Sequence, residues 1–143
     1  MILLDANIAI ALIEVDHQAG ERLRSALAAN ETIALSVIAL HELRYGASKS
    51  ARPEHNHARI DALLSGPIGI EPFTVDDAAE AGRVRAELER RGTPIGAYDL
   101  LIAGQGLRLG ATVATNNVRE FQRVDELAIE DWLAPPEPIT NNR

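Results

Sequence analysis

The sequence predicts an α/β fold in which helices flank both faces of a mostly parallel central sheet. Short apolar runs of strand length alternate with segments of helical periodicity along the chain. No internal repeat and no linker interrupts this alternation. Such a pattern is typical of chains whose parallel strands are joined by helices. A length of 143 residues favours a single domain.

The first half of the chain contains two predicted strands and four predicted helices. Met1 to Leu4 form an apolar run that predicts a buried strand, and Ser36 is the expected N-cap of the helix after the second strand. Ser65, Gly66 and Pro67 stop the last of these helices. The strands are expected over residues 1–5 and 32–35, and the helices over residues 7–13, 18–29, 36–46 and 53–64.

The second half continues the same alternation. Gly92 and Pro94 break its longest helix, and Gly110 is the expected stop of the next one. The expected elements are an extended segment over residues 68–73, helices over 74–91 and 98–109, a strand over 111–115 and an edge strand over 127–130. We expect one domain over residues 1–133, followed by a loose, Pro-rich tail over residues 134–143.

Composition limits the class of protein. Apolar residues make up 46% of the chain, but no run is long enough for a transmembrane helix. Cysteine is absent and the N-terminus lacks the basic region of a signal peptide, so a soluble cytoplasmic protein is expected. A net charge of −7 argues against nonspecific nucleic-acid binding through a basic face. The basic residues nevertheless gather locally, which leaves the partner open: Arg44, Lys49 and Arg52; Arg90 and Arg91; Arg119 and Arg123.

Three carboxylates stand apart from the other acidic residues. Asp5 ends the first strand, and Glu42 and Asp99 lie in helical segments with no basic residue three or four positions away. Glu21, by contrast, has Arg24 three residues on, which is the spacing of a surface ion pair. Ligands of a parallel sheet bind at the carboxyl ends of its strands, where these residues could converge. Because clustered carboxylates repel one another, the pattern favours a divalent metal site.

Each carboxylate also has a purely structural interpretation. Asp5 could be a turn residue or the N-cap of the next helix. Glu42 could be exposed on its helix, and Asp99 could stabilise the dipole of a first helical turn. One shared metal site accounts for all three residues together. Two other features are interpreted as structural: Gly104 and Gly106 lie within a helix and indicate close helix packing, and Trp132 is expected to pack near the C-terminus.

Several motifs in a fixed order carry a family resemblance over essentially all of residues 1–133. The motifs are Leu4–Asn7, Ser36–Gly46, Gly92–Ile95, Tyr98–Gly104, Thr115–Phe121 and Ile129–Trp132. Together they resemble the PIN-domain ribonucleases and, among these, the VapC toxins of type II toxin–antitoxin pairs. The resemblance implies a PIN fold, dependence on Mg²⁺ or Mn²⁺, and cleavage of RNA.

The resemblance also implies a set of site residues. Asp5, Glu42 and Asp99 match the three acidic positions of the family, which hold the metal and carry catalysis. Asn117 occupies the fourth catalytic position, which is often Asp in PIN domains, and Glu120 is an alternative for that role. The family motif Asp-Thr-Asn reads Asp-Ala-Asn here, so this chain lacks the Thr hydroxyl that the family places near the metal.

The implied activity is hydrolysis of an RNA phosphodiester. Asp5 and Asp99 would be the main ligands, Glu42 would bind a second metal or orient water, and arginines at the rim would hold the RNA backbone. The family implies structured RNA such as tRNA, with initiator tRNA as the first candidate. It also implies a homodimer and a VapB-like antitoxin whose Arg or Lys enters the carboxylate cluster. The helix over residues 53–64 would offer the antitoxin exposed Ile60, Leu63 and Leu64.

Two alternatives belong to other classes. One is a non-catalytic PIN-fold binding module that only pairs with an antitoxin, which the missing fourth carboxylate supports. The other is an aspartyl-nucleophile phosphatase, which also begins with a strand and an Asp. That chemistry requires a second acid where Asn7 stands and a positioned lysine, for which Lys49 is the only candidate.

Overall fold

The computed structural model describes residues 1–135 and contains a five-stranded, entirely parallel sheet. The strand order is β3-β2-β1-β4-β5. The predicted parallel α/β architecture is therefore confirmed. The strands are β1 (Ile2–Leu4), β2 (Ile33–Ser36), β3 (Gly69–Glu71), β4 (Thr112–Thr115) and β5 (Ala128–Asp131).

The order of the strands creates a switch point beside the central strand. From β1 the chain builds outward through β2 and β3, and it then returns to the other side of β1 to add β4 and β5. Leu4 is in register with Leu35 on one side and with Ala114 on the other. The loops that leave β1 and β4 therefore diverge, and open α/β sheets bind ligands in the crevice between such loops.

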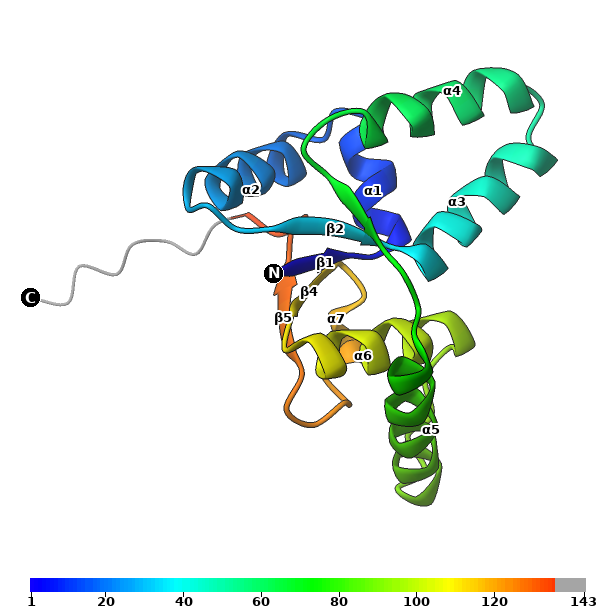
Figure 1. Cartoon of the computed structure of the whole chain (residues 1–143), viewed down its shortest axis with the longest axis vertical. Helices are drawn as coiled ribbons and strands as arrows, with labels where there is room; N and C mark the ends of the chain where they lie inside the picture. Colours follow the sequence, from blue (N-terminus) through cyan, green and yellow to red (C-terminus); the bar gives the residue numbers. More distant parts are fainter. Residues whose placement is uncertain (136–143) are drawn as a thin grey trace, which may run out of the picture.

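Helices cover both faces of the sheet (Figure 1). In that view α1 and α2 lie on one side, and α6 lies on the other with α5 packed against it. α3 and α4 pack against each other and against α1. The helices are α1 (Ala6–Ile13), α2 (His17–Ala28), α3 (Val37–Lys49), α4 (Pro53–Leu64), α5 (Val75–Arg90), α6 (Ala97–Leu109) and α7 (Val118–Phe121).

The helix ends follow local chemistry. The Ser36 hydroxyl accepts a hydrogen bond from the Ile38 amide, as expected of an N-cap. Thr74 and Asp77 form a reciprocal capping box at the start of α5. Gly110 ends α6 in the left-handed conformation, with φ of 61°. The short helix α7 was not predicted, because four residues carry too little periodicity to identify a helix.

The core lies on both faces of the buried central strands and consists mainly of aliphatic side chains. Trp132 is 1% exposed, which confirms its predicted packing role. A Cβ placed on Gly104 would lie 2.6 Å from the backbone nitrogen of Ala81, so α5 and α6 approach closely there. No helix within residues 1–135 has both the length and the apolar character that membrane crossing requires. Residues 136–143, most of the predicted tail, lie outside the described residues.

Candidate active site

Asp5 lies at the carboxyl end of β1 and is only 3% exposed. Its carboxylate caps α1 by accepting a hydrogen bond of 3.0 Å from the Ile8 amide. Burial raises the pKa of Asp5, and hydrogen bonds from Thr115 and from the backbone lower it in part. The capping interpretation of Asp5 is therefore correct, but it does not remove the cost of burying this charge.

Glu42 lies in the middle of α3 and is half-buried. Burial raises its pKa, and the negative charge of Asp5 raises it further. Because α3 packs against α1, the helix that follows Asp5, it brings Glu42 toward the end of β1 from far along the chain. The alternative in which Glu42 is simply exposed on its helix is therefore wrong.

Asp99 lies in the first turn of α6 and makes no capping hydrogen bond. Burial, a hydrogen bond with Glu120 and the charges of Glu120 and Asp5 raise the pKa of Asp99 to about 7. The same hydrogen bond lowers the pKa of Glu120. At neutral pH the two carboxyl groups therefore share a proton, which is how adjacent carboxylates relieve their repulsion.

Asn117 bridges these two carboxyl groups. Its side-chain nitrogen Nδ2 donates to Asp99 Oδ2 and to Glu120 Oε2, each at 2.8 Å. The fourth position of the predicted site therefore lies beside Asp99, as expected. The side-chain amide of Asn117 donates to both carboxylates. Glu120 therefore belongs to the site together with Asn117, and does not take its place.

The structure also brings Thr115 into the site, which sequence reasoning did not single out. Thr115 is fully buried at the end of β4. Its hydroxyl accepts a hydrogen bond of 2.8 Å from the backbone N–H of Asn117 and contributes a hydrogen bond to Asp5. It therefore supplies a hydroxyl beside Asp5, although Ala6 stands where the family motif has Thr. Its position at the carboxyl end of a predicted strand was the available signal.

The three carboxylates have no salt-bridge partner among the described residues. None of the ion pairs within residues 1–135 involves Asp5, Glu42 or Asp99. Lys49, the lysine considered for a phosphatase, instead lies over the Tyr45 ring with Nζ 4.7 Å from its centroid. The predicted surface pair of Glu21 and Arg24 is present. The site carboxylates are therefore not neutralised by ion pairs, in contrast to acids such as Glu21, Asp61 and Asp77.

These donors suit a hard divalent cation, because all of them are oxygen atoms. Within residues 1–135, however, no three acidic or histidine side chains lie close enough to enclose a metal ion by themselves. The arrangement is therefore an open site in which water or phosphate oxygens would complete the coordination. Mg²⁺ commonly binds in this way, through one or two carboxylates.

Two pockets are lined in part by the helices α3 and α6, which carry Glu42 and Asp99. One groove, here called the α1–α3–α4 groove, contains Glu42 and is lined largely by apolar side chains. These include Ile10, Ile13, Leu43, Ala47 and Ile60. Ile60 is only 4% exposed, and Leu63 and Leu64 are partly buried, so the prediction that they form an exposed apolar surface is wrong. Ile10, at 41% exposed, is the accessible apolar residue of this groove.

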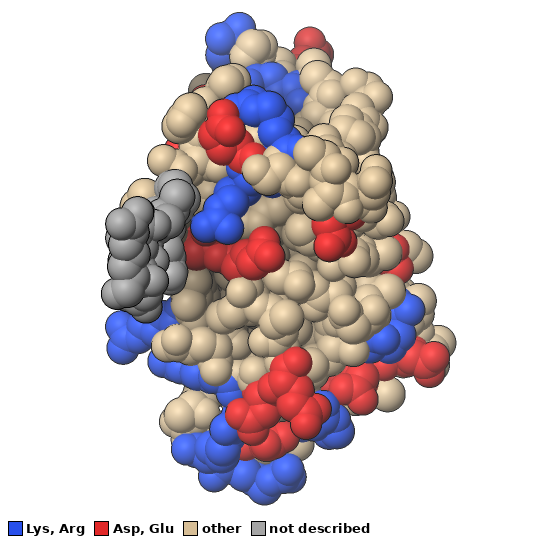
Figure 2. Space-filling view, turned by 90° about the vertical axis from the view of Figure 1, so that its left-hand side faces the viewer, with Lys and Arg blue, Asp and Glu red and all other residues tan. Residues whose placement is uncertain are grey.

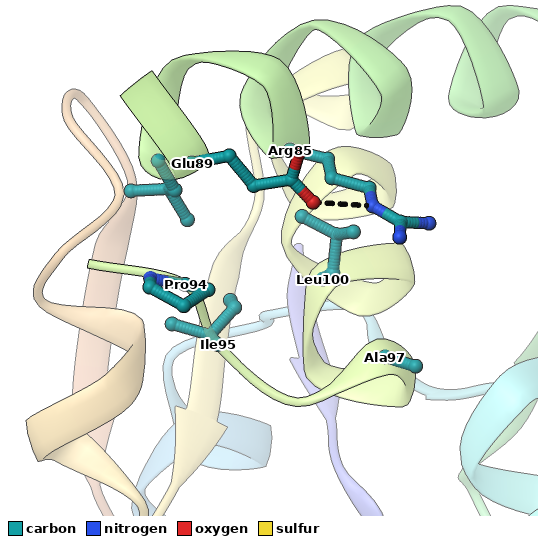
Figure 3. Close-up of a pocket in the computed structure, with 7 residues that line it drawn as sticks. Arg85, Glu89, Pro94, Ile95, Ala97 and Leu100 are labelled. Carbon is teal, nitrogen blue, oxygen red and sulfur yellow. Dashed lines mark hydrogen bonds and ion pairs between the residues drawn. The ribbon is translucent and has the colours of Figure 1, made fainter. Parts of the chain in front are cut away.

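A second pocket lies between α5 and the segment that leads into α6 (Figure 3). Pro94, Ile95 and Leu100 form its apolar wall, and an ion pair between Arg85 and Glu89 lies beside them. None of the predicted site residues lines this pocket. The candidate active site is thus identified by its carboxylates rather than by the shape of the surface.

The charged surface bears on how the molecule meets nucleic acid. Figure 2 shows one face, on which acidic and basic side chains are interspersed and no continuous basic stripe crosses the described residues. That face agrees with the net charge of −7. On this face, therefore, no continuous basic surface is present to follow a nucleic-acid backbone.

Comparison with known proteins matches this fold and site to one family. A PIN-domain family model matches residues 2–127. Ribonuclease VapC2 of Rickettsia felis is 40% identical over 130 residues, which cover 91% of this chain and 96% of the relative. The tRNA(fMet)-specific endonuclease VapC of Salmonella typhimurium is 40% identical over 131 residues, with the same coverage of 91% and 96%.

Solved structures agree. VapBC2 from Rickettsia felis, bound to a DNA fragment from its promoter, matches with a TM-score of 0.86 and 40% identity, covering 92% of this chain and 99% of the other. DNA-bound VapBC from Salmonella typhimurium matches with a TM-score of 0.84 and 39% identity, covering 92% and 97%. The chain therefore belongs to the PIN-domain family. Within that family it is a VapC-type ribonuclease toxin, as the sequence motifs predicted.

Proposed function

We propose that this chain is a metal-dependent endoribonuclease toxin that cleaves structured RNA. The observation that carries the proposal is the arrangement of Glu42 and Asp99 around buried Asp5, whose negative charge raises the pKa of both, at the switch point of the sheet. None of the ion pairs within residues 1–135 neutralises these three groups. Relatives named as VapC ribonucleases and endonucleases support the activity on RNA. A divalent cation would supply the positive charge that this site lacks.

The residues have separate roles in this proposal. Asp5 and Asp99 would hold the cation, and Glu42 would hold a second cation or orient the attacking water. The chemistry that Mg²⁺ or Mn²⁺ would supply there is polarisation of the phosphate and a lower pKa of bound water. Asn117 fixes the direction of the Asp99 carboxyl group through its hydrogen bond. Asp99, whose pKa is raised to about 7, would have to lose its proton to act as a metal ligand.

The substrate we propose is tRNA, with initiator tRNA as the first candidate. Support comes from the relative in Salmonella typhimurium, which is named for tRNA(fMet) and is 40% identical to this chain. The test is incubation of the purified full chain with total tRNA in Mg²⁺, followed by sequencing of the new 5′ ends. One cleavage site that disappears in EDTA and in Glu42→Gln is the expected result. Intact tRNA in Mg²⁺ and in Mn²⁺ would favour the non-catalytic binding module instead.

The partner we propose is a small VapB-like antitoxin. Solved VapBC complexes of relatives support such a partner. An apolar segment of the antitoxin would lie in the α1–α3–α4 groove against Ile10 and Ile13, and an Arg or Lys next to it would meet Glu42. The chain alone is proposed to be a homodimer, which light scattering would measure. Co-expression with the adjacent small gene should restore growth; arrest despite a stable complex would contradict occlusion of the site.

A further inference from the structure

The aromatic side chains of this protein are few and unevenly distributed. Aromatic residues make up only 3% of the chain. Trp132 and Phe121 are buried, whereas Tyr45 is 60% exposed and Tyr98 is 47% exposed. The two exposed aromatic rings of the described residues are thus the two tyrosines, and both lie next to the candidate active site.

Each tyrosine lies close in sequence to one of the site carboxylates. Tyr98 immediately precedes Asp99 at the start of α6, and Tyr45 lies one helical turn after Glu42 on α3. His41 connects the two helices: its ring meets the Tyr98 ring edge-on with centroids 5.6 Å apart, and its Nε2 lies 3.3 Å from the Tyr98 hydroxyl. The charge of His41 also acts on Glu42. The aromatic surface is therefore continuous with the carboxylate site.

A positive charge completes this surface. His41, Tyr45 and Lys49 are spaced four residues apart along α3 and so lie on one side of the helix. Lys49, the only lysine of the chain, lies over the Tyr45 ring at 4.7 Å. Lys49 forms none of the salt bridges found within residues 1–135. Its ammonium group is thus available to a phosphate beside the aromatic rings.

We propose that His41, Tyr45, Lys49 and Tyr98 form a platform for unpaired nucleotides that flank the cleaved phosphodiester. Bases stack on the tyrosine rings, and Lys49 binds a backbone phosphate. Stacking on aromatic side chains needs bases that are free of a double helix, and it tolerates sequence differences because every base has a π-face. The proposal rests on the ribonuclease function above and deepens it: cleavage is directed to a loop or a single-stranded segment of the structured RNA.

Charge favours RNA over a second protein as the occupant. The two tyrosines are accompanied by a lysine and a histidine, a combination suited to phosphates and bases. The groove that suits an apolar protein segment is a different one, formed by α1, α3 and α4 around Ile10 and Ile60. The platform is also next to Asp99, so a bound nucleotide there places its phosphate near the carboxylates.

The test measures binding apart from cleavage. The full chain carries Asp5→Asn so that RNA stays intact, and the probe is a fluorescein-labelled oligoribonucleotide, used single-stranded and as a duplex. Tyr45→Ala and Tyr98→Ala should each weaken single-strand binding by roughly tenfold, since stacking is lost. Tyr45→Phe and Tyr98→Phe should remain within about twofold, because the ring is kept. Val75→Ala, at an exposed apolar position of α5, serves as the matched control.

The salt dependence of RNA binding tests whether Lys49 binds a phosphate. Lys49→Met should lower the slope of log affinity against log salt by about 0.7, the share of one phosphate contact on a single strand. Duplex binding should change little in all the tyrosine variants. Equal losses on single strand and duplex, or a Phe variant as weak as its Ala variant, would overturn the proposal. So would dissociation of a dimer by the Ala variants with RNA binding unchanged, which would make this face an interface between copies.

The ribonuclease function and the nucleotide platform can be tested separately. Protein with Asp5 intact reports on the ribonuclease function through cleavage in Mg²⁺. If it binds single-stranded RNA through the tyrosines but never cleaves, the ribonuclease function is wrong and the platform stands. If it cleaves and the Ala variants retain wild-type KM and kcat, the platform is wrong and the ribonuclease function stands.

Discussion

Asn117 donates its side-chain amide to Asp99, with Nδ2 2.8 Å from Oδ2. The same nitrogen donates to Glu120, so one neutral residue bridges two carboxyl groups whose negative charges repel each other. The fourth position of the site thus stabilises the acidic cluster in the metal-free protein. A carboxylate there would leave this repulsion uncompensated.

Asn117→Asp should destabilise the protein in EDTA, because a third carboxylate replaces two favourable hydrogen bonds. Lost bonds of this kind cost about 1–3 kcal/mol of unfolding free energy. In Mn²⁺ the Asn117→Asp protein should instead be more stable than wild type, since the added charge tightens metal binding. Thermal melts in EDTA and in Mn²⁺ measure both effects, with Asn117→Ala as the variant that loses the bonds without gaining charge. An Asn117→Asp protein that melts like wild type in both buffers would contradict this role.

Asp99→Asn should stabilise the metal-free protein at alkaline pH. Folding raises the pKa of Asp99 from 3.8 to about 7, so the folded state binds this proton more tightly than the unfolded state. The resulting stability is complete below pH 3.8 and is lost as the pH rises through about 7. A neutral amide avoids that loss, and after allowance for solvent screening the gain at pH 8 is on the order of 1 kcal/mol.

Melting temperatures in EDTA between pH 5 and pH 8 provide the measurement. The advantage of Asp99→Asn over wild type should shrink as the pH falls, whereas Glu126→Gln, at an exposed position away from the site, should show no such trend. A pH-independent difference would show that Asp99 does not carry the raised pKa.

Asp5→Asn and Asp5→Ala should separate catalysis from helix capping. Asn keeps a side-chain oxygen that accepts from the Ile8 amide but removes the charge, so cleavage should fall about 100-fold or more with little loss of stability. The Asp5→Ala substitution removes both the accepting oxygen and the charge, so this variant should lose a further ~1 kcal/mol of stability. Cleavage assays and urea unfolding of both variants provide the comparison. Full activity in Asp5→Asn would exclude Asp5 as a metal ligand.

Gly104→Ala should destabilise the packing of α6 on α5. The added Cβ would lie within 2.7 Å of the backbone and side chain of Ala81, which is backbone contact that a rotamer change does not relieve. Overpacking of this kind costs about 1–3 kcal/mol. Gly82→Ala is the matched control, because nothing lies within 4 Å of its Cβ and it should gain up to about 1 kcal/mol from helix propensity. Equal melting temperatures for the two variants would show that the close contact is absent.

The sequence by itself was sufficient to predict every strand, all helices except α7, and their order, and it singled out Asp5, Glu42 and Asp99 as candidate site residues. Caps such as Ser36 and stops such as Gly110 act through neighbouring backbone groups, so local sequence is sufficient to predict them. The alternation of strands and helices then restricts the topology to a parallel sheet. Glu42 and Asp99 stood out because no basic residue lies three or four positions away, and Asp5 stood out because it ends an apolar strand.

Only the tertiary structure decided how the acids interact and which surfaces are exposed. The raised pKa of Asp99 depends on Glu120, which α7 brings beside α6. Ile60 is buried although the sequence suggested an exposed position, because α4 packs against α1 and α3. Asn117, predicted for the fourth catalytic position, donates to Asp99 because the turn between β4 and α7 places it beside the first turn of α6. Burial, charge repulsion and side-chain hydrogen bonds arise between segments distant in sequence, and local periodicity contains no information on those distances.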